Sequence, residues 1–196
     1  MSSTINYFNK SHIKNNNSFL IIGSYKKSFV VKDILHNLDI IYGCVVTNKS
    51  DYVSWCKPQY CFSQLNQQLM SEYKNIQMKY KQKSFLFIDV INGTNLFQKT
   101  YIKEFMFMHQ CYNTSIIIAA DNICDVDVNN ITYIIILKED NEEKRLKIYS
   151  LFVPVFGTYE NFSNVMNTLT YRKSLIIENN NYCIYLSYLR CVKLLF

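Results

Sequence analysis

Residues 18–38 read SFLIIGSYKKSFVVKDILHNL, and this stretch decides the fold class. Its first five residues, SFLII, form a short apolar run that stops at Gly23, which is typical of a buried strand. Residues 28–38 then place apolar side chains at helical spacing. Residues 40–47, IIYGCVVT, are again rich in strand formers. The sequence therefore predicts a strand, a turn, a helix and a second strand, which is a βαβ unit.

The rest of the chain continues to alternate between helices and buried strands. The clearest helix is predicted over residues 62–83, where apolar residues recur every three or four positions. SFLFIDVI, residues 84–91, is an apolar run broken only by Asp89, as in a central parallel strand covered on both faces. Further strands are predicted over 115–121 and 131–137, helices over 97–112, 142–151 and 159–171, and a C-terminal β-hairpin over SLIIEN and YCIYLSYL. This order predicts an α/β fold with a mostly parallel central sheet.

Length and composition limit the class of protein. The 196 residues fit one domain, and 49% hydrophobic residues exclude wholesale disorder. We expect a polar N-terminal tail over residues 1–17 and a single domain over 18–196. No apolar run reaches the roughly 18 residues that a membrane span needs, and the N-terminus has no signal-peptide stretch. These features predict a soluble intracellular protein.

Charge and cysteine content are less informative. The net charge of +6 permits a nucleic-acid partner, but the lysines are scattered along the chain, as on a solvated surface. The seven cysteines include no Cys-x-x-Cys pair, so we expect free thiols in a reducing compartment and no zinc site.

The candidate site lies where predicted strands end. Ligands of parallel sheets bind at the carboxyl ends of the strands, so we expect the site among Gly23–Ser28, Thr47–Asn48, Asp89 and Asp121–Asn122. GSYKKS, which begins at Gly23, matches the end of a phosphate-binding loop, in which a lysine neutralises phosphate and a serine hydroxyl binds Mg²⁺. FLFID, which ends at Asp89, matches a Walker B strand, whose aspartate holds the Mg²⁺ shell. The two motifs in this order predict a P-loop NTPase-like three-layer fold.

Each of these residues also has a purely structural interpretation. Lys27 could be an exposed lysine, and Ser28 the N-cap of the helix. Asp89, Asp121 and Asn122 could be turn-forming residues at strand ends.

The order of the remaining segments resembles the genome-packaging ATPases of nucleocytoplasmic large DNA viruses, a branch of the FtsK/HerA translocases. The segments that carry the resemblance are VVTNKSDYVSWCKPQYCF (45–62), QQLMSEYKNIQMKYKQKSFLFID (67–89), EFMFMHQCYNTSIIIAAD (104–121), VNNITYII (128–135) and YSLFVPVFGTYENFSNVMNTLTYRKSLIIENN (149–180). The resemblance covers about residues 18–190 and depends on the order and spacing of these blocks. It implies ATP and Mg²⁺ as cofactors, with nucleotide-binding residues at Gly23, Lys26, Lys27 and Ser28 and the metal at Asp89.

The sequence departs from that family at four catalytic features. The family loop is GxxxxGK[ST], whereas the stretch from Gly23 to Lys27 is two residues shorter and has Lys26 where the family has glycine. Val90 replaces a second acid that orients the attacking water, and it cannot accept a proton. Asp121 replaces the sensor glutamine, and Val128 replaces an arginine that could stabilise transferred phosphate. Four changes together favour a pseudo-ATPase that needs neither ATP nor Mg²⁺.

The resemblance implies a part in DNA packaging or virion assembly, in the host cytoplasm at viral factories or in the virion. A degenerate member would act by binding double-stranded DNA, an active packaging-ATPase paralogue or a capsid protein, as a homo- or hetero-oligomer and without a membrane. Two alternatives stay open. One is an active ATP-driven packaging motor subunit in which Lys27, Ser28 and Asp89 survive as the site, and the other is a structural virion protein that keeps only the fold.

Overall fold

The computed structural model describes residues 5–38, 40, 42–49, 52, 60–90, 100–121, 128–181 and 183–188. The strands in these ranges are β1 (Asn6–Tyr7), β2 (Ser18–Ile22), β3 (Tyr42–Val46), β4 (Cys61–Phe62), β5 (Ser84–Val90), β6 (Thr114–Ala120), β7 (Tyr133–Ile136), β8 (Lys173–Glu178) and β9 (Cys183–Tyr188). The helices are η1 (Lys10–His12, a 3-10 turn), α1 (Lys27–Leu38), α3 (Gln67–Tyr80), α4 (Thr100–Met108), α5 (Glu142–Leu151), α6 (Val153–Phe156) and α7 (Tyr159–Thr168).

The described strands form one sheet in the order β1-β9-β8-β7-β2-β6-β5-β3-β4. β2 lies inside the sheet and pairs in parallel with β6 on one side and β7 on the other. β5 pairs in parallel with both β6 and β3. Only β8 runs against its neighbours β7 and β9, so the mostly parallel sheet and the C-terminal hairpin are both confirmed.

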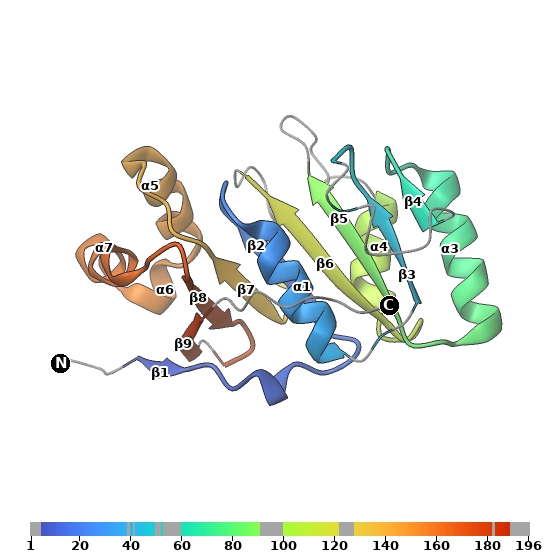
Figure 1. The fold of residues 1–196 in the computed structure, drawn as a ribbon, viewed down its shortest axis with the longest axis horizontal. Coiled ribbons are helices and arrows are strands. Elements are labelled where there is room, and N and C mark those ends of the chain that lie inside the picture. The colour runs from blue at the N-terminus through green and yellow to red at the C-terminus, as the bar shows by residue number, and fades with distance from the viewer. Residues whose placement is uncertain are drawn as a thin grey trace.

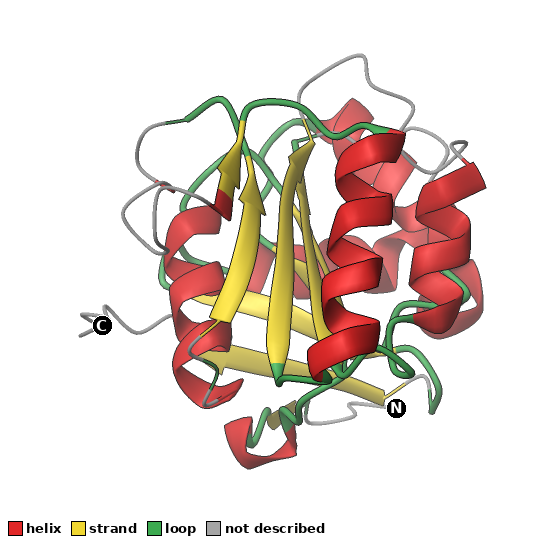
Figure 2. Cartoon of the chain, turned by 90° about the vertical axis from the view of Figure 1, so that its right-hand side faces the viewer, coloured by secondary structure: helices red, strands yellow, loops and turns green. Residues whose placement is uncertain are grey.

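Helices cover both faces of this sheet (Figures 1 and 2). One apolar cluster combines residues of α3, α4 and the α5–α7 group with one face of the strands. A second cluster combines α1 and Phe8 with the other face. Because each central strand is buried on both faces, its sequence is apolar at successive positions and not only at alternate ones. The three-layer arrangement is the one that the sequence predicted.

The long helix before β5 begins later than predicted. Its apolar period extends back to Phe62, but Phe62 pairs with Val46 in the two-residue strand β4. The helix starts after Asn66, whose side-chain oxygen accepts a 2.8 Å hydrogen bond from the Leu69 backbone N–H. This N-cap satisfies a backbone donor that the first helical turn leaves unpaired, and it fixes the boundary.

Part of the segment expected as a polar tail lies against the sheet. β1 pairs in parallel with β9, and Phe8 is buried beside Tyr133 and Tyr185. Lys10 forms an ion pair with Asp33 of α1. The domain boundary at residue 18 stays a prediction. Within the described ranges, no helix has both the length and the apolar character to cross a bilayer.

Candidate functional site

Three strand ends meet at one edge of the sheet and form the candidate site. Ile22 of β2 and Val90 of β5 both lie opposite Ala120 of β6, so β6 stands between the two predicted motif strands. The backbone N–H of Gly23 donates a 3.0 Å hydrogen bond to the carbonyl oxygen of Ala120. The residues that follow β2 and β6 are therefore adjacent, as the strand-end rule predicts.

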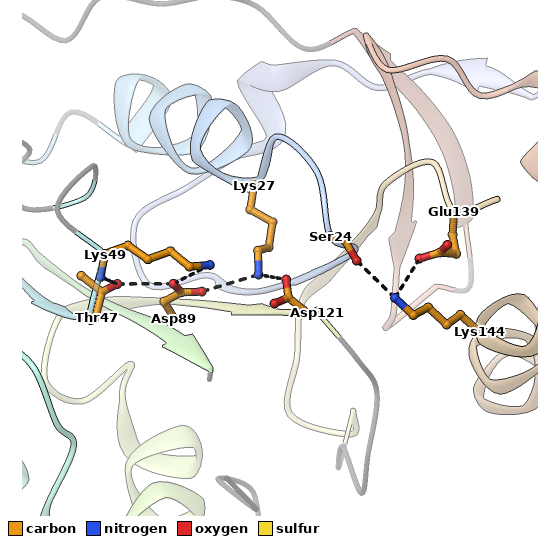
Figure 3. Close-up of polar contacts among 8 residues, drawn as sticks. All are labelled: Ser24, Lys27, Thr47, Lys49, Asp89, Asp121, Glu139 and Lys144. Carbon is orange, nitrogen blue, oxygen red and sulfur yellow. Dashed lines mark hydrogen bonds and ion pairs between the residues drawn. The ribbon is translucent and has the colours of Figure 1, made fainter. Parts of the chain in front are cut away.

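Lys27 lies at the centre of this site and is buried, with 4% of its surface exposed. Its ammonium forms a close ion pair and hydrogen bond with Asp121 and lies 3.5 Å from Oδ1 of Asp89 (Figure 3). The alternative of an exposed Lys27 is therefore wrong. A buried ammonium needs paired carboxylates, and two aspartates supply them here.

Asp89 is the most deeply buried acid of the site, with its side chain 1% exposed. Its Oδ2 lies 3.3 Å from the ammonium of Lys49 and accepts a 3.3 Å hydrogen bond from the Thr47 hydroxyl. Its Oδ1 accepts no hydrogen bond from the described residues, so Lys27 meets that oxygen's charge as an ion pair only. The Asp89 side chain thus contacts two lysines, and the segment after β5 that it could cap lies outside the described residues.

Lys27, Lys49, Asp89 and Asp121 form what we name the lysine–aspartate cluster. Two positive and two negative charges balance within it (Figure 3). Sequence reasoning singled out Thr47 but missed Lys49, which lies three residues after the end of β3. The backbone N–H of Lys49 donates a 3.0 Å hydrogen bond to the Thr47 hydroxyl, which fixes the turn between them. The predicted window Thr47–Asn48, extended by one residue, would have included Lys49.

The loop between β2 and α1 is short, and its backbone is unusual at both ends. Gly23 has a φ of 137°, and a Cβ there would lie 2.8 Å from Cβ of Leu137, so this position needs glycine. Lys26 has a φ of 58°, in the left-handed region that favours glycine. Its side chain is exposed and lies over the Phe29 ring, 5.9 Å from the ring centroid. Lys26 is therefore not part of the lysine–aspartate cluster.

A second contact ties this loop to α5. The Lys144 ammonium donates a 3.3 Å hydrogen bond to the Ser24 hydroxyl and lies 3.8 Å from a carboxylate oxygen of Glu139 (Figure 3). The loop is therefore held from both sides, by the cluster through Lys27 and by α5 through Ser24.

The remaining predicted residues are placed as follows. Ser28 lies half-buried inside the first turn of α1, because the helix begins at Lys27, so Ser28 is not an N-cap. Val90 ends β5 and packs against the apolar core. Val128 lies near the amino-terminal end of β2, at the end of the strands opposite the site. Nearby Thr132 donates a backbone hydrogen bond to Ser18 at the start of β2. The structure therefore does not bring Val128 to Lys27, and Asn122 lies outside the described residues.

The charged side chains of the site are paired mainly with one another and not arranged around a metal ion. In the part of the chain that the structure describes, no group of three or more His, Cys, Asp or Glu side chains is placed to hold a metal ion. Asp89 and Asp121 are near each other, but the Lys27 ammonium occupies the position between them. Val90, beside Asp89, cannot orient a water molecule.

No protein-family model matches this sequence, and no curated protein matches it. Solved structures do match. B204, the DNA-packaging ATPase from Sulfolobus turreted icosahedral virus, superposes with a TM-score of 0.64 and 17% identity, over 88% of this chain and 97% of that one. The genome-packaging NTPase B204 from Sulfolobus turreted icosahedral virus 2, in complex with ATP-gammaS, gives a TM-score of 0.67 and 16% identity, over 87% and 96%.

A more distant neighbour is the cytoplasmic domain of the type VII secretion ATPase EccC from Thermomonospora curvata. It gives a TM-score of 0.53 and 10% identity, over 87% of this chain and 25% of that one. At such identities a likeness shows the fold. The chain therefore has the P-loop NTPase-like fold that viral packaging ATPases share, as the resemblance predicted.

Proposed function

We propose that this chain is a catalytically degenerate relative of the viral genome-packaging ATPases, which serves DNA packaging or virion assembly by binding and not by hydrolysing ATP. The observation that carries the proposal is the lysine–aspartate cluster. Lys27, at the position of the phosphate-binding lysine, is buried and paired with Asp121 and Asp89. The side chain that should meet phosphate meets carboxylates instead.

ATP with Mg²⁺ does not fit this arrangement of residues. A phosphate that reached Lys27 would meet the carboxylate of Asp121 at the same ammonium, and the two negative charges would repel. A Mg²⁺ ion at Asp89 would lie beside the ammonium groups of Lys27 and Lys49. Structures of B204 in complex with ATP-gammaS and AMP support nucleotide binding by that relative. In this chain the loop is short and the Lys27 ammonium is already paired with carboxylates, which supports a function that does not depend on ATP binding.

The active packaging motor is the second candidate. It is favoured by the meeting of Gly23, Lys27 and Asp89 at one edge of the sheet, as a nucleotide site requires. Under that hypothesis, substrate would have to displace Asp121 from Lys27. The two candidates therefore differ in what Asp121 does.

The test compares the wild type with Asp121→Gln, which removes the competing carboxylate and restores the amide of the family pattern. We expect no heat of Mg-ATP binding and no phosphate release from the wild type, with or without double-stranded DNA. Asp121→Gln should gain ATP binding, because the ammonium of Lys27 loses its nearest carboxylate, but it should not gain hydrolysis while Val90 is unchanged. The measurements are isothermal titration calorimetry and a phosphate-release assay.

Glu72→Gln is the matched control, since Glu72 is an exposed carboxylate on α3 and belongs to neither site. It should leave ATP binding unchanged. DNA-stimulated hydrolysis by the wild type, abolished by Asp89→Asn in a protein that still folds, would establish the active motor and refute the degenerate one. Lys27→Ala is a poorer probe of function, because it also removes the cation that two carboxylates need.

A further inference from the structure

A hollow lies beside the loop that precedes Lys27, but outside the lysine–aspartate cluster. Its walls include Tyr25 and Lys26 from the loop, Lys138 from the segment after β7, and Tyr171 and Lys173 before and in β8. We name it the tyrosine–lysine hollow. Three cationic side chains and two aromatic rings thus come from three separate segments to one place.

The two tyrosines present their rings to solvent. Tyr25 is 64% exposed and Tyr171 is 49% exposed. Their ring centroids lie 6.1 Å apart with an interplanar angle of 79°, so the edge of one ring meets the face of the other, and both rings keep exposed aromatic surface. Exposed aromatic faces are the surfaces on which nucleic-acid bases stack.

The charge around these rings is mainly positive. The Lys138 ammonium lies 4.8 Å from the centroid of the Tyr171 ring, and it pairs with Asp140 at 3.3 Å. The Tyr171 hydroxyl also donates to Asp140, at 3.4 Å. Lys26 is exposed and forms no ion pair with any residue in the described ranges. Lys26, Lys138 and Lys173 all line the hollow, so its lining carries three positive charges next to the carboxylate of Asp140.

The size of the hollow decides between a free small molecule and a chain. It is a shallow depression, and its empty space of about 210 Å³ includes open solvent. Small-molecule sites usually measure roughly 300–1,000 Å³ and enclose most of their ligand. A shallow hollow of this kind does not enclose a small molecule, so a ligand would lie across its rim, over the tyrosine rings and along the lysines.

We propose that the tyrosine–lysine hollow binds single-stranded nucleic acid, with a base stacked on the exposed tyrosines and the adjoining phosphates on Lys26, Lys138 and Lys173. This inference goes beyond the proposed function and does not require that the lysine–aspartate cluster be inactive. Stacking accepts any base, so the binding should depend little on sequence. Phosphate contacts should make it depend strongly on salt.

The test measures binding of a fluorescein-labelled oligothymidylate to the full chain by fluorescence anisotropy at about 50 mM salt. Tyr171→Ala should weaken binding roughly tenfold, since it removes one stacking platform. Tyr171→Phe should bind like the wild type, because it keeps the ring and loses only the hydrogen bond to Asp140. Lys26→Ala should reduce the slope of log affinity against log salt by about 0.7, the value for one phosphate contact with a single strand.

The opposite end of the molecule offers matched controls. Tyr80 on α3 is 58% exposed, and the Lys79 ammonium lies 5.2 Å from its ring centroid. Tyr80→Ala and Lys79→Ala remove the same kinds of side chain at a site that lacks the hollow, so both should bind like the wild type.

Three outcomes would overturn the proposal. One is an absence of oligonucleotide binding by the folded wild type. Another is a Tyr171→Ala variant that binds as tightly as the wild type. The third is displacement of the oligonucleotide by AMP at a concentration as low as that at which the oligonucleotide itself binds, which would identify a free-nucleotide site. Since ATP hydrolysis is measured separately on the Asp121→Gln variant, failure of this proposal and failure of the proposed function remain distinguishable.

Discussion

Lys27 contributes to the stability of the fold, whatever its part in function. Its ammonium is almost fully buried and balances Asp89, whose side chain is 1% exposed, and Asp121, whose side chain is 28% exposed. Removing one member of a buried pair leaves an uncompensated charge. We expect Lys27→Ala to lower the free energy of unfolding by about 3 kcal/mol, measured by urea denaturation.

Lys26→Ala is the control for that measurement, because Lys26 is the exposed neighbour in the same loop. It should change the unfolding free energy by no more than about 0.5 kcal/mol. If Lys27→Ala were as mild as Lys26→Ala, the lysine–aspartate cluster would not exist in solution.

His109 gives the molecule a predictable response to pH. It is buried, and its Nδ1–H donates a 2.8 Å hydrogen bond to the carbonyl oxygen of Thr114. Burial lowers the pKa of His109 below its ordinary value, and the Thr114 hydrogen bond only partly offsets this effect. The unfolded chain therefore takes up the proton first as the pH falls. Stability should drop below about pH 6.5, by at most about 1.4 kcal/mol per pH unit.

Urea unfolding at about pH 7.5 and about pH 5.5 tests this response. His109→Gln, whose amide can still donate to Thr114, should lose less stability between the two pH values than the wild type. His36→Gln changes an exposed histidine and should keep the wild-type dependence. An identical pH dependence in His109→Gln would mean that His109 is not the group responsible.

At the scale of elements, the pairing of β3 with β5 depends on one small residue. Gly43 lies opposite Phe85 in the parallel register, and a Cβ built at Gly43 would overlap the buried Phe85 ring. We expect Gly43→Ala to cost roughly 2 kcal/mol of unfolding free energy, because the ring must leave its rotamer. Adding Phe85→Leu should recover part of this loss, since the smaller side chain vacates the space of the ring.

A double-mutant cycle measures that recovery. The two changes at Gly43 and Phe85 should together cost less than the sum of the single variants. Phe105→Leu, in the apolar cluster on the other face, should add to Gly43→Ala without coupling. Simple additivity in both cycles would show that the Phe85 ring does not limit the close approach of these strands.

The elements that could be predicted from the sequence are those with a long and buried pattern. β5 and β6 are almost wholly buried, so their apolar runs stand out. The two-residue strands β1 and β4 are too short to show a period, and pairing with β9 and β3 alone defines them. Phe62 fits the helical period of α3, yet the N-cap at Asn66 makes the helix begin only at Gln67, after Phe62.

The position of the candidate site could be predicted from the sequence, but the ion pairs within it could not. Strand order puts Lys27, Asp89 and Asp121 at one edge, and the strand-end rule identified all three. The rule could not show that the Lys27 ammonium contacts carboxylates rather than solvent, because that depends on side-chain distances. It also stopped short of Lys49, whose contact with Asp89 arises from the turn after β3. The strand-end positions thus predict which residues lie near one another, whereas the pairing of their charges depends on how the side chains pack.

At the scale of the whole molecule, the N-terminal segment joins parts that are far apart in the chain. The Phe8 backbone N–H donates a 2.8 Å hydrogen bond to the carbonyl oxygen of Leu186 in β9. Its ring meets those of Tyr133 and Tyr185 at 5.4 Å and 5.5 Å between centroids. Two residues further on, Lys10 pairs with Asp33 of α1. Residues 6–10 thus connect the hairpin at the edge of the sheet with α1, the helix that begins at Lys27 (Figure 1).

This connection should be lost as a unit while the centre of the sheet stays intact. Phe8→Ala removes a ring that is 8% exposed and should cost about 3 kcal/mol, near the low end for a buried phenylalanine because β1 lies at the sheet edge. Tyr7→Ala removes the neighbouring side chain, which is 57% exposed, and should cost far less. In hydrogen exchange, Phe8→Ala should expose the amides of β9 that face β1 and leave those of β5 and β6 protected, because local opening needs less free energy than global unfolding. Equal loss of protection in β5 and β9 would instead mean that the N-terminal segment and the central sheet unfold as one cooperative unit.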